Sequence, residues 1–85
     1  SVVLSDRAVA GRTVFEDNCT VCHGDGLAGG TGPALGRGSQ AAERPLDALE
    51  ATIRQGGNGM PSWRSLLEDS EISDVLAYLA EMQGR

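Results

Sequence analysis

Glycine is concentrated in one part of this sequence and limits what the chain can fold into. Seven of the twelve glycines lie between positions 24 and 38, and three more lie between positions 56 and 59. Glycine destabilises the interiors of helices and strands and is favoured in turns and at close backbone contacts. We therefore expect a loop of about 20 residues in the first region, and a loop this long in a compact domain usually has a function.

Three segments have the apolar spacing of short helices, roughly residues 6–19, 46–55 and 70–83. Residues that favour helix ends flank them: Ser5 as N-cap of the first, Pro45 at the first helical position of the second, Gly56 after its end, and Asp69 or Ser70 as N-cap of the third. A further short turn is expected at 63–67. No segment alternates long enough to predict a strand. The sequence thus predicts an all-α fold with long loops, in which residues 1–85 form a single domain.

Each expected helix has one apolar face. The members of these faces are Val9, Phe15 and Cys19 on the first helix, Leu46, Leu49 and Ile53 on the second, and Ile72, Val75, Leu76, Leu79 and Met82 on the third. Three helices this short supply little apolar area, and a chain of this length is near the size at which domains need an additional stabilising element. We therefore expect a further apolar group to fill the centre of the fold.

The charge pattern narrows the choice of partners. The net charge is −5, all seven basic residues are arginine, and they form no basic cluster. This argues against binding to nucleic acid or to an anionic membrane and is compatible with a partner protein that has a basic patch. There is no run of about 18 apolar residues that would span a membrane. The first residues do not resemble a signal peptide, so we expect a cytosolic protein, a mature processed form or an excised domain.

The segment Cys19-Thr20-Val21-Cys22-His23 matches C-x-x-C-H, the attachment motif of c-type haem. Two thiols one helical turn apart can each add to a vinyl group on the same edge of a porphyrin. The histidine that follows is then placed to bind the iron as an axial ligand. A haem would also supply the apolar group that the centre of the fold lacks. The motif therefore predicts one haem c, covalently bound through Cys19 and Cys22, with His23 as an iron ligand.

Other uses of two nearby cysteines fit this sequence less well. A thioredoxin-like pair expects a preceding strand and a βαβ context, which the sequence does not predict. A structural zinc ion needs four ligands, and the motif provides three. A disulfide between Cys19 and Cys22 would close only a very small loop and would stabilise the fold little. The match of positions 24–29 to a dinucleotide-binding G-x-G-x-x-G follows no strand, and we interpret those glycines as turn residues.

A second axial ligand is expected from methionine. Met60 lies in a glycine-rich segment and precedes Pro61, and its thioether is a soft ligand that raises the potential of a haem iron. Met82, the other methionine, continues the apolar face of the third helix and fits a core position. Trp63 fits either a hydrogen bond to a haem propionate or a place in the core. Three arginines are candidate propionate partners: Arg37, Arg54 and Arg64.

Together these motifs resemble class I c-type cytochromes of the short bacterial monohaem type. Residues 11–23 are similar to the family's G-x-x-x-F-x-x-x-C-x-x-C-H, residues 32–35 to its G-P-x-L, and residues 53–61 to its methionine loop. Residues 74–79 resemble the segment of the last helix that crosses the first. The absence of lysine excludes a lysine-ringed docking face of the mitochondrial type. The resemblance implies a small cytochrome c fold of three main helices and long loops around one haem.

The resemblance also implies roles for individual residues. The carbonyl oxygen of Pro33 would accept a hydrogen bond from Nδ1 of His23 and fix its orientation. Leu35 would pack on the haem, and Ile53 and Arg54 would belong to its binding residues. In the family, an aromatic residue at the position of Tyr78 packs on those of Gly11 and Phe15.

The expected function is one-electron transfer by a small soluble carrier in the periplasm, and not enzyme catalysis. The alternative is a haem c subunit, or an excised domain, of a larger dehydrogenase. Two further interpretations remain. One is a catalytic or gas-binding haem with an open iron site, which rapid carbon monoxide binding by the ferrous protein would favour. The other is a haem-free thiol oxidoreductase, which titratable thiols in a colourless protein would favour.

Overall fold

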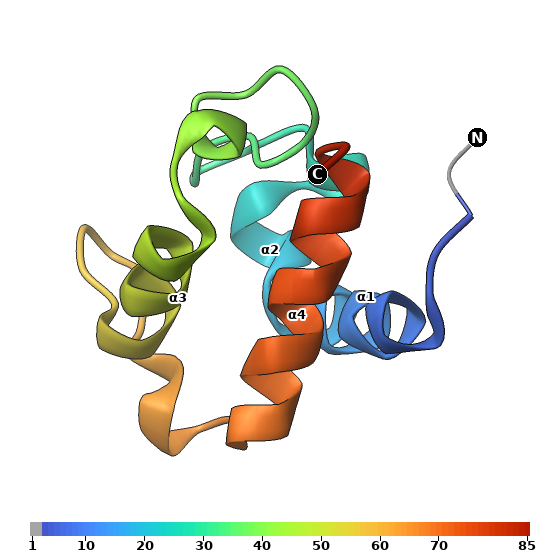
Figure 1. Cartoon of the computed structure of the whole chain (residues 1–85). Helices are drawn as coiled ribbons and strands as arrows, with labels where there is room; N and C mark the ends of the chain where they lie inside the picture. The colour runs from blue at the N-terminus through green and yellow to red at the C-terminus, as the bar shows by residue number, and fades with distance from the viewer. Residues whose placement is uncertain (1–2) are drawn as a thin grey trace.

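The computed structural model describes residues 3–85, which fold into four α-helices joined by loops and three 3₁₀ turns (Figure 1). The helices are α1 (Asp6–Asn18), α2 (Thr20–His23), α3 (Leu46–Gln55) and α4 (Asp69–Met82). The 3₁₀ turns are Asp25–Leu27, Ala41–Glu43 and Trp63–Ser65. Apart from one bridged pair, Gly57 and Met60, the described part of the chain contains no β-structure. The predicted all-α class is confirmed.

Helix α1 begins where the sequence predicted. The hydroxyl of Ser5 accepts a hydrogen bond from the backbone N–H of Ala8 at 3.1 Å, which is the expected N-cap contact. The buried residues of α1 are Ala8, Gly11 and Phe15. The expectation that Val9 shares this face is wrong, because Val9 is 41% exposed and lies one position round the helix from Ala8. The buried face therefore follows the spacing 8, 11 and 15.

Helix α1 lies across α4, and this crossing is the tightest contact between helices (Figure 1). A Cβ atom at Gly11 would lie 1.9 Å from the carbonyl oxygen of Asp74, so only glycine permits this approach. The rings of Phe15 and Tyr78 pack with their centroids 5.6 Å apart, as expected. The backbone of α4 at Asp74 and Val75 lies nearest to Gly11. That Tyr78 also packs on Gly11 stays a prediction.

The other helix ends differ slightly from the prediction. Helix α4 begins one residue earlier than expected because Glu68 is its N-cap, forming a capping box with Glu71 in place of a cap by Asp69 or Ser70. Helix α3 has the predicted bounds, but Pro45 occupies the N-cap position and not the first helical position. The expected turn at 63–67 is the 3₁₀ turn Trp63–Ser65.

The loop between α2 and α3 is ordered by tight turns and short 3₁₀ turns. Gly24, Gly26 and Gly29 all have positive φ angles, which confirms their interpretation as turn residues. Two of the 3₁₀ turns interrupt this loop and were not predicted. Leu27 is almost fully buried, and its carbonyl oxygen accepts a hydrogen bond from the N–H of Leu35 at 3.0 Å. The loop therefore folds back on itself around one apolar side chain.

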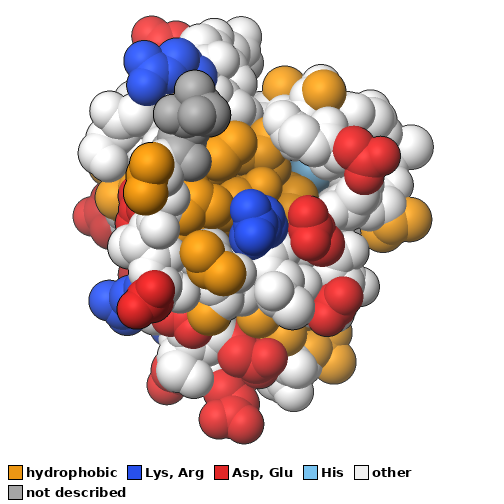
Figure 2. Space-filling model, turned by 90° about the vertical axis from the view of Figure 1, so that its right-hand side faces the viewer, with side chains coloured by type: hydrophobic (Ala, Val, Ile, Leu, Met, Phe, Trp, Pro, Cys, Tyr) orange, Lys and Arg blue, Asp and Glu red, His pale blue; other side chains and the backbone are white. Residues whose placement is uncertain are grey.

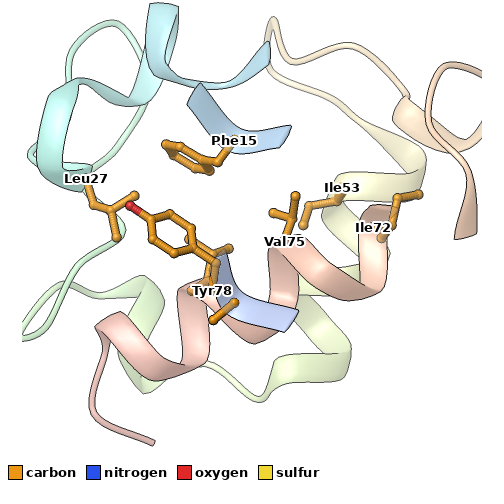
Figure 3. Close-up of a cluster of buried hydrophobic side chains, with 8 residues drawn as sticks. Phe15, Leu27, Ile53, Ile72, Val75 and Tyr78 are labelled. Carbon is orange, nitrogen blue, oxygen red and sulfur yellow. The ribbon is translucent and has the colours of Figure 1, made fainter. Parts of the chain in front are cut away.

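The core lies between α1, α4 and the loops (Figure 3). Figure 3 shows Phe15, Leu27, Ile53, Val75 and Tyr78 converging from separate parts of the chain. Of the predicted face of α4, Ile72, Val75 and Leu79 are buried, whereas Leu76 and Met82 are half-buried. Among the helices of residues 3–85, none combines the length and the apolarity that crossing a bilayer requires.

Candidate functional site

An apolar cavity lies between the helices and the loops, with about 330 Å³ of space free of protein atoms, part of it open to solvent. Helices α1, α2, α3 and α4 and the two long loops all contribute to its wall. The lining residues are Phe15, Cys19, His23, Leu35, Ile53, Met60, Leu67, Val75 and Leu79. Apart from the imidazole of His23, these side chains offer only carbon and sulfur. The cavity is therefore suited to a large apolar group that is bound through nitrogen and sulfur.

Of the two cysteines, only Cys19 lines the cavity. Cys19 is the C-cap of α1, and Cys22 lies in α2, the single turn that follows. Cys19 is half-buried in the cavity wall and Cys22 is exposed, and they are not joined in a disulfide. Burial, and then the neighbouring Cys22, raise the pKa of Cys19 to about 11. A redox-active thiol needs a lowered pKa, so this environment argues against thiol oxidoreductase chemistry.

His23 is the buried end of α2, and its ring is fixed from several sides. Its Nδ1 lies 2.8 Å from the carbonyl oxygen of Pro33, the contact that the sequence predicted. Because a carbonyl oxygen can only accept, Nδ1 carries the proton and Nε2 has a free lone pair for a metal. The ring of Phe15 lies 6.2 Å away between centroids. A Cβ atom at Gly32 would lie 3.0 Å from Cε1 of His23, so glycine allows the loop to approach the ring.

Met60 reaches the cavity from the loop between α3 and α4. This loop makes a tight turn in which Gly57 and Met60 exchange backbone hydrogen bonds of 2.9 and 3.0 Å. The side chain of Met60 is half-buried and lines the cavity together with His23. Met82 packs against the core near the end of α4 and is not part of the lining. The structure thus brings the imidazole and one thioether to the same cavity.

The residues expected at the haem propionates do not line the cavity. Trp63 is half-buried against the core and does not line the cavity. Arg54 is held by Glu50 at 2.9 Å and Asp69 at 2.8 Å, and hydrogen bonds to Asp69 and then to Glu50 raise its pKa further. Arg37 lies against Gly84 near the C-terminal end of α4, and Arg64 is exposed. The propionate roles of these residues stay predictions.

Sequence reasoning missed four lining residues: Phe15, Leu67, Val75 and Leu79. Phe15, Val75 and Leu79 were recognised as apolar helix positions and assigned to the core alone. The apolar face of α4 serves both purposes, because it packs on α1 and also closes the cavity. Leu67 lies in the short connection before α4, where no periodicity marks it.

The donor set fits a haem c. Such a group requires two thiols close together in the chain, an imidazole with a free Nε2, a thioether and apolar walls. Cys19, His23 and Met60 line the cavity, and Cys22 lies in the same short helix as His23. Within residues 3–85, there is no group of three or more histidine, cysteine or acidic side chains that could hold a metal ion. A zinc site among these residues therefore has no support.

Comparisons with known proteins show the family to which the chain belongs. The sequence model of the family described as "Cytochrome C oxidase, cbb3-type, subunit III" matches residues 6–79. Cytochrome c55X of Stutzerimonas stutzeri is 41% identical over 77 residues, which cover 88% of this chain and 66% of that protein. The cbb3-type cytochrome c oxidase subunit CcoP of Azospirillum brasilense is 31% identical over 94 residues, covering 94% of this chain and 30% of the subunit.

A solved structure is similar in both fold and sequence. Cytochrome c6 from the diatom Phaeodactylum tricornutum has a TM-score of 0.71 and 29% identity, with 86% of this chain and 90% of that chain covered. By contrast, the chain spans just under two thirds of the c55X protein and less than a third of the oxidase subunit. The match to the family over most of the chain, the helical fold and the C-x-x-C-H motif lead to one conclusion. The chain belongs to the cytochrome c family and carries one haem c.

Proposed function

We propose that this chain is a one-electron carrier whose haem iron is held by His23 and Met60. When bound, the haem supplies an iron that alternates between the ferrous and ferric states. The observation that carries the proposal is that an imidazole with a free Nε2 and a thioether line the same apolar cavity. Small relatives of this kind, including cytochromes c6 and c-550, support the same function.

The chain's own residues each have a defined part in this proposal. Cys19 and Cys22 would hold the haem through thioether bonds formed by addition of each thiol to a vinyl group. The carbonyl oxygen of Pro33 accepts a hydrogen bond from Nδ1 of His23, which would leave Nε2 to bind the iron and make the imidazole a stronger donor. The Met60 thioether would be the second protein ligand of the iron and would raise its potential. The apolar walls exclude water, so the surroundings of the iron change little when its charge changes.

The two methionines provide a matched test. The ferric protein is expected to show the weak far-red absorption band of sulfur-to-iron charge transfer. Met60→Ala is expected to abolish this band and lower the reduction potential, whereas Met82→Ala keeps both. A Met60→Ala protein that retains the band and the potential excludes Met60 as a ligand. A filled second axial position also predicts slow carbon monoxide binding by the ferrous protein, in keeping with electron transfer and not catalysis.

Redox partner proteins with a basic patch fit the charge of this chain, which is −5. On the face shown in Figure 2, acidic side chains are interspersed with apolar ones, a pattern suited to a transient and salt-sensitive encounter. The rate of electron exchange with a basic partner is then expected to fall as salt concentration rises. An increase with salt would contradict this choice of partner. The compartment is extracytoplasmic, where haem c proteins mature, and for a bacterial chain this is the periplasm.

A second candidate function is favoured by the length comparison. Because the chain spans less than a third of the CcoP subunit, domains of this kind also occur inside larger proteins. The chain would then pass electrons within a permanent complex, such as an oxidase or a dehydrogenase. Size-exclusion chromatography of native material distinguishes the two candidates, since a stable complex supports the second and a free monomer supports the first.

A further inference from the structure

The loop that carries Met60 begins at the end of α3 and ends at the start of α4 (Figure 1). Arg54 lies in the last turn of α3, and its Nη1 donates to Oδ1 of Asp69 at 2.8 Å. Asp69 is the first residue of α4. One guanidinium group therefore joins the two ends of the loop. The same group donates from Nε to Oε2 of Glu50 at 2.9 Å, but Glu50 lies on α3 itself and does not bridge the loop.

Two further contacts close the same loop around Arg54. The hydroxyl of Ser62 donates to the backbone carbonyl oxygen of Arg54 at 2.5 Å. Gly56, two residues after Arg54, approaches the far side of the loop so closely that a Cβ atom there would lie 2.6 Å from the carbonyl oxygen of Met60. The segment on either side of Met60 is thus tied back to the last turn of α3. Without these ties, the residues between α3 and α4 would gain many conformations that move the thioether out of the cavity.

We propose that Arg54 is a positioning residue for Met60, acting through its ion pair with Asp69 across the ends of the loop. This inference rests on the proposed function, since it assumes that Met60 is an iron ligand. Arg54 acts on the iron only through the loop and not by direct contact. The Asp69 side chain is 87% exposed, and exposed ion pairs have small effects, so we expect a change of about twofold to fivefold.

The two carboxylate partners of Arg54 make a matched pair for the test. Imidazole is titrated into the haem-loaded ferric protein, and its displacement of Met60 is followed by loss of the far-red band. Asp69→Asn is expected to raise the apparent imidazole affinity by about twofold to fivefold. Glu50→Gln removes a carboxylate from the same guanidinium without freeing the loop ends and is expected to leave the affinity unchanged. Arg54→Ala should behave like Asp69→Asn, and Arg54→Lys should restore part of the wild-type value.

A control separates positioning from general stability. Arg7 forms a comparable ion pair with Asp74 at 3.2 Å, between α1 and α4 and away from the loop. Arg7→Ala is expected to lower the denaturant midpoint without changing imidazole affinity. Equal changes in Asp69→Asn and Glu50→Gln, or no change in Asp69→Asn, would overturn the inference and leave Met60 ligation intact. A wild-type protein without the far-red band would overturn Met60 ligation itself, and this inference with it.

Discussion

Two regions of the molecule are ordered in different ways. One is the crossing of α1 and α4, and the other consists of the two long loops that help to line the cavity. At the crossing, side chains and backbone of the protein pack directly on each other, as Gly11 does on Asp74 and Phe15 on Tyr78. In the loops, order comes from backbone turns, and Leu35 and Met60 are half-buried with their side chains in the cavity wall. The crossing therefore has packing partners within the chain, whereas we propose that the loops take much of theirs from the haem.

This difference indicates which part of the fold the sequence stabilises alone. Ala8 and Gly11 of α1 and Tyr78 of α4 are buried and do not line the cavity, so their packing partners lie within the protein. The loops contain most of the glycines, which lose the most conformational freedom when they become ordered. A haem that is attached covalently compensates this cost, because it cannot dissociate from the loops that it orders. We expect stability to be unevenly distributed over the molecule.

The largest expected effect follows from removing the haem. In a Cys19→Ser, Cys22→Ser double variant, the local free energy of opening of residues 24–44 and 56–68 is expected to fall to about zero, while that of α1 and α4 stays clearly positive. Native-state hydrogen exchange, measured by NMR against the haem-loaded wild type, tests this difference. Loops that remain as protected as the helices in the haem-free chain would show that the two regions do not differ in this way.

A substitution at the crossing should destabilise the other region of the molecule. Gly11→Val adds a side chain where a Cβ atom would lie 1.9 Å from the carbonyl oxygen of Asp74. Such overpacking is expected to lower the free energy of unfolding by about 3 kcal/mol even with haem attached. Denaturant unfolding followed by circular dichroism measures it. Ala10→Val, at an exposed position of the same helix, is the control and should cost less than about 0.5 kcal/mol. Similar losses in both variants would argue against a tight crossing.

The smallest expected effect concerns the acid stability of the crossing. The hydroxyl of Ser5, and then its backbone N–H, donate to Glu81 and lower the pKa of that carboxyl below its usual 4.5. The stabilisation is therefore present above about pH 4.5 and is lost as pH falls through the lowered pKa. Glu81→Gln is expected to flatten the pH dependence of stability below pH 4.5 relative to wild type. Thermal unfolding between about pH 3 and pH 6 tests this, and identical profiles for Glu81→Gln and wild type would exclude the contact as a source of acid sensitivity.

The sequence predicted the helices well because helices depend on local patterns. The bounds of α3 and the Ser5 cap follow from residue type and spacing, whereas the hydrogen bond from His23 to Pro33 was expected from the family resemblance. The face of α1 was harder, because a helix as rich in small residues as this one buries Ala8 and Gly11 and leaves Val9 exposed. The ion pair between Arg54 and Asp69 could not be predicted from the sequence, since it depends on how the Met60 loop folds.

The hydrogen bond from His23 to Pro33 has a consequence for how this protein can change in evolution. The acceptor is a main-chain oxygen, so no substitution at position 33 deletes it. Substitutions at other positions also leave the carbonyl oxygen of Pro33 in place, provided that the loop keeps its conformation. Most point mutations are therefore expected to preserve the hydrogen bond that orients the imidazole. Gly32 is the exception, because any side chain there must displace the ring or the loop. Drift in the properties of the iron is then expected to come from the Met60 side, where the donor is a replaceable side chain.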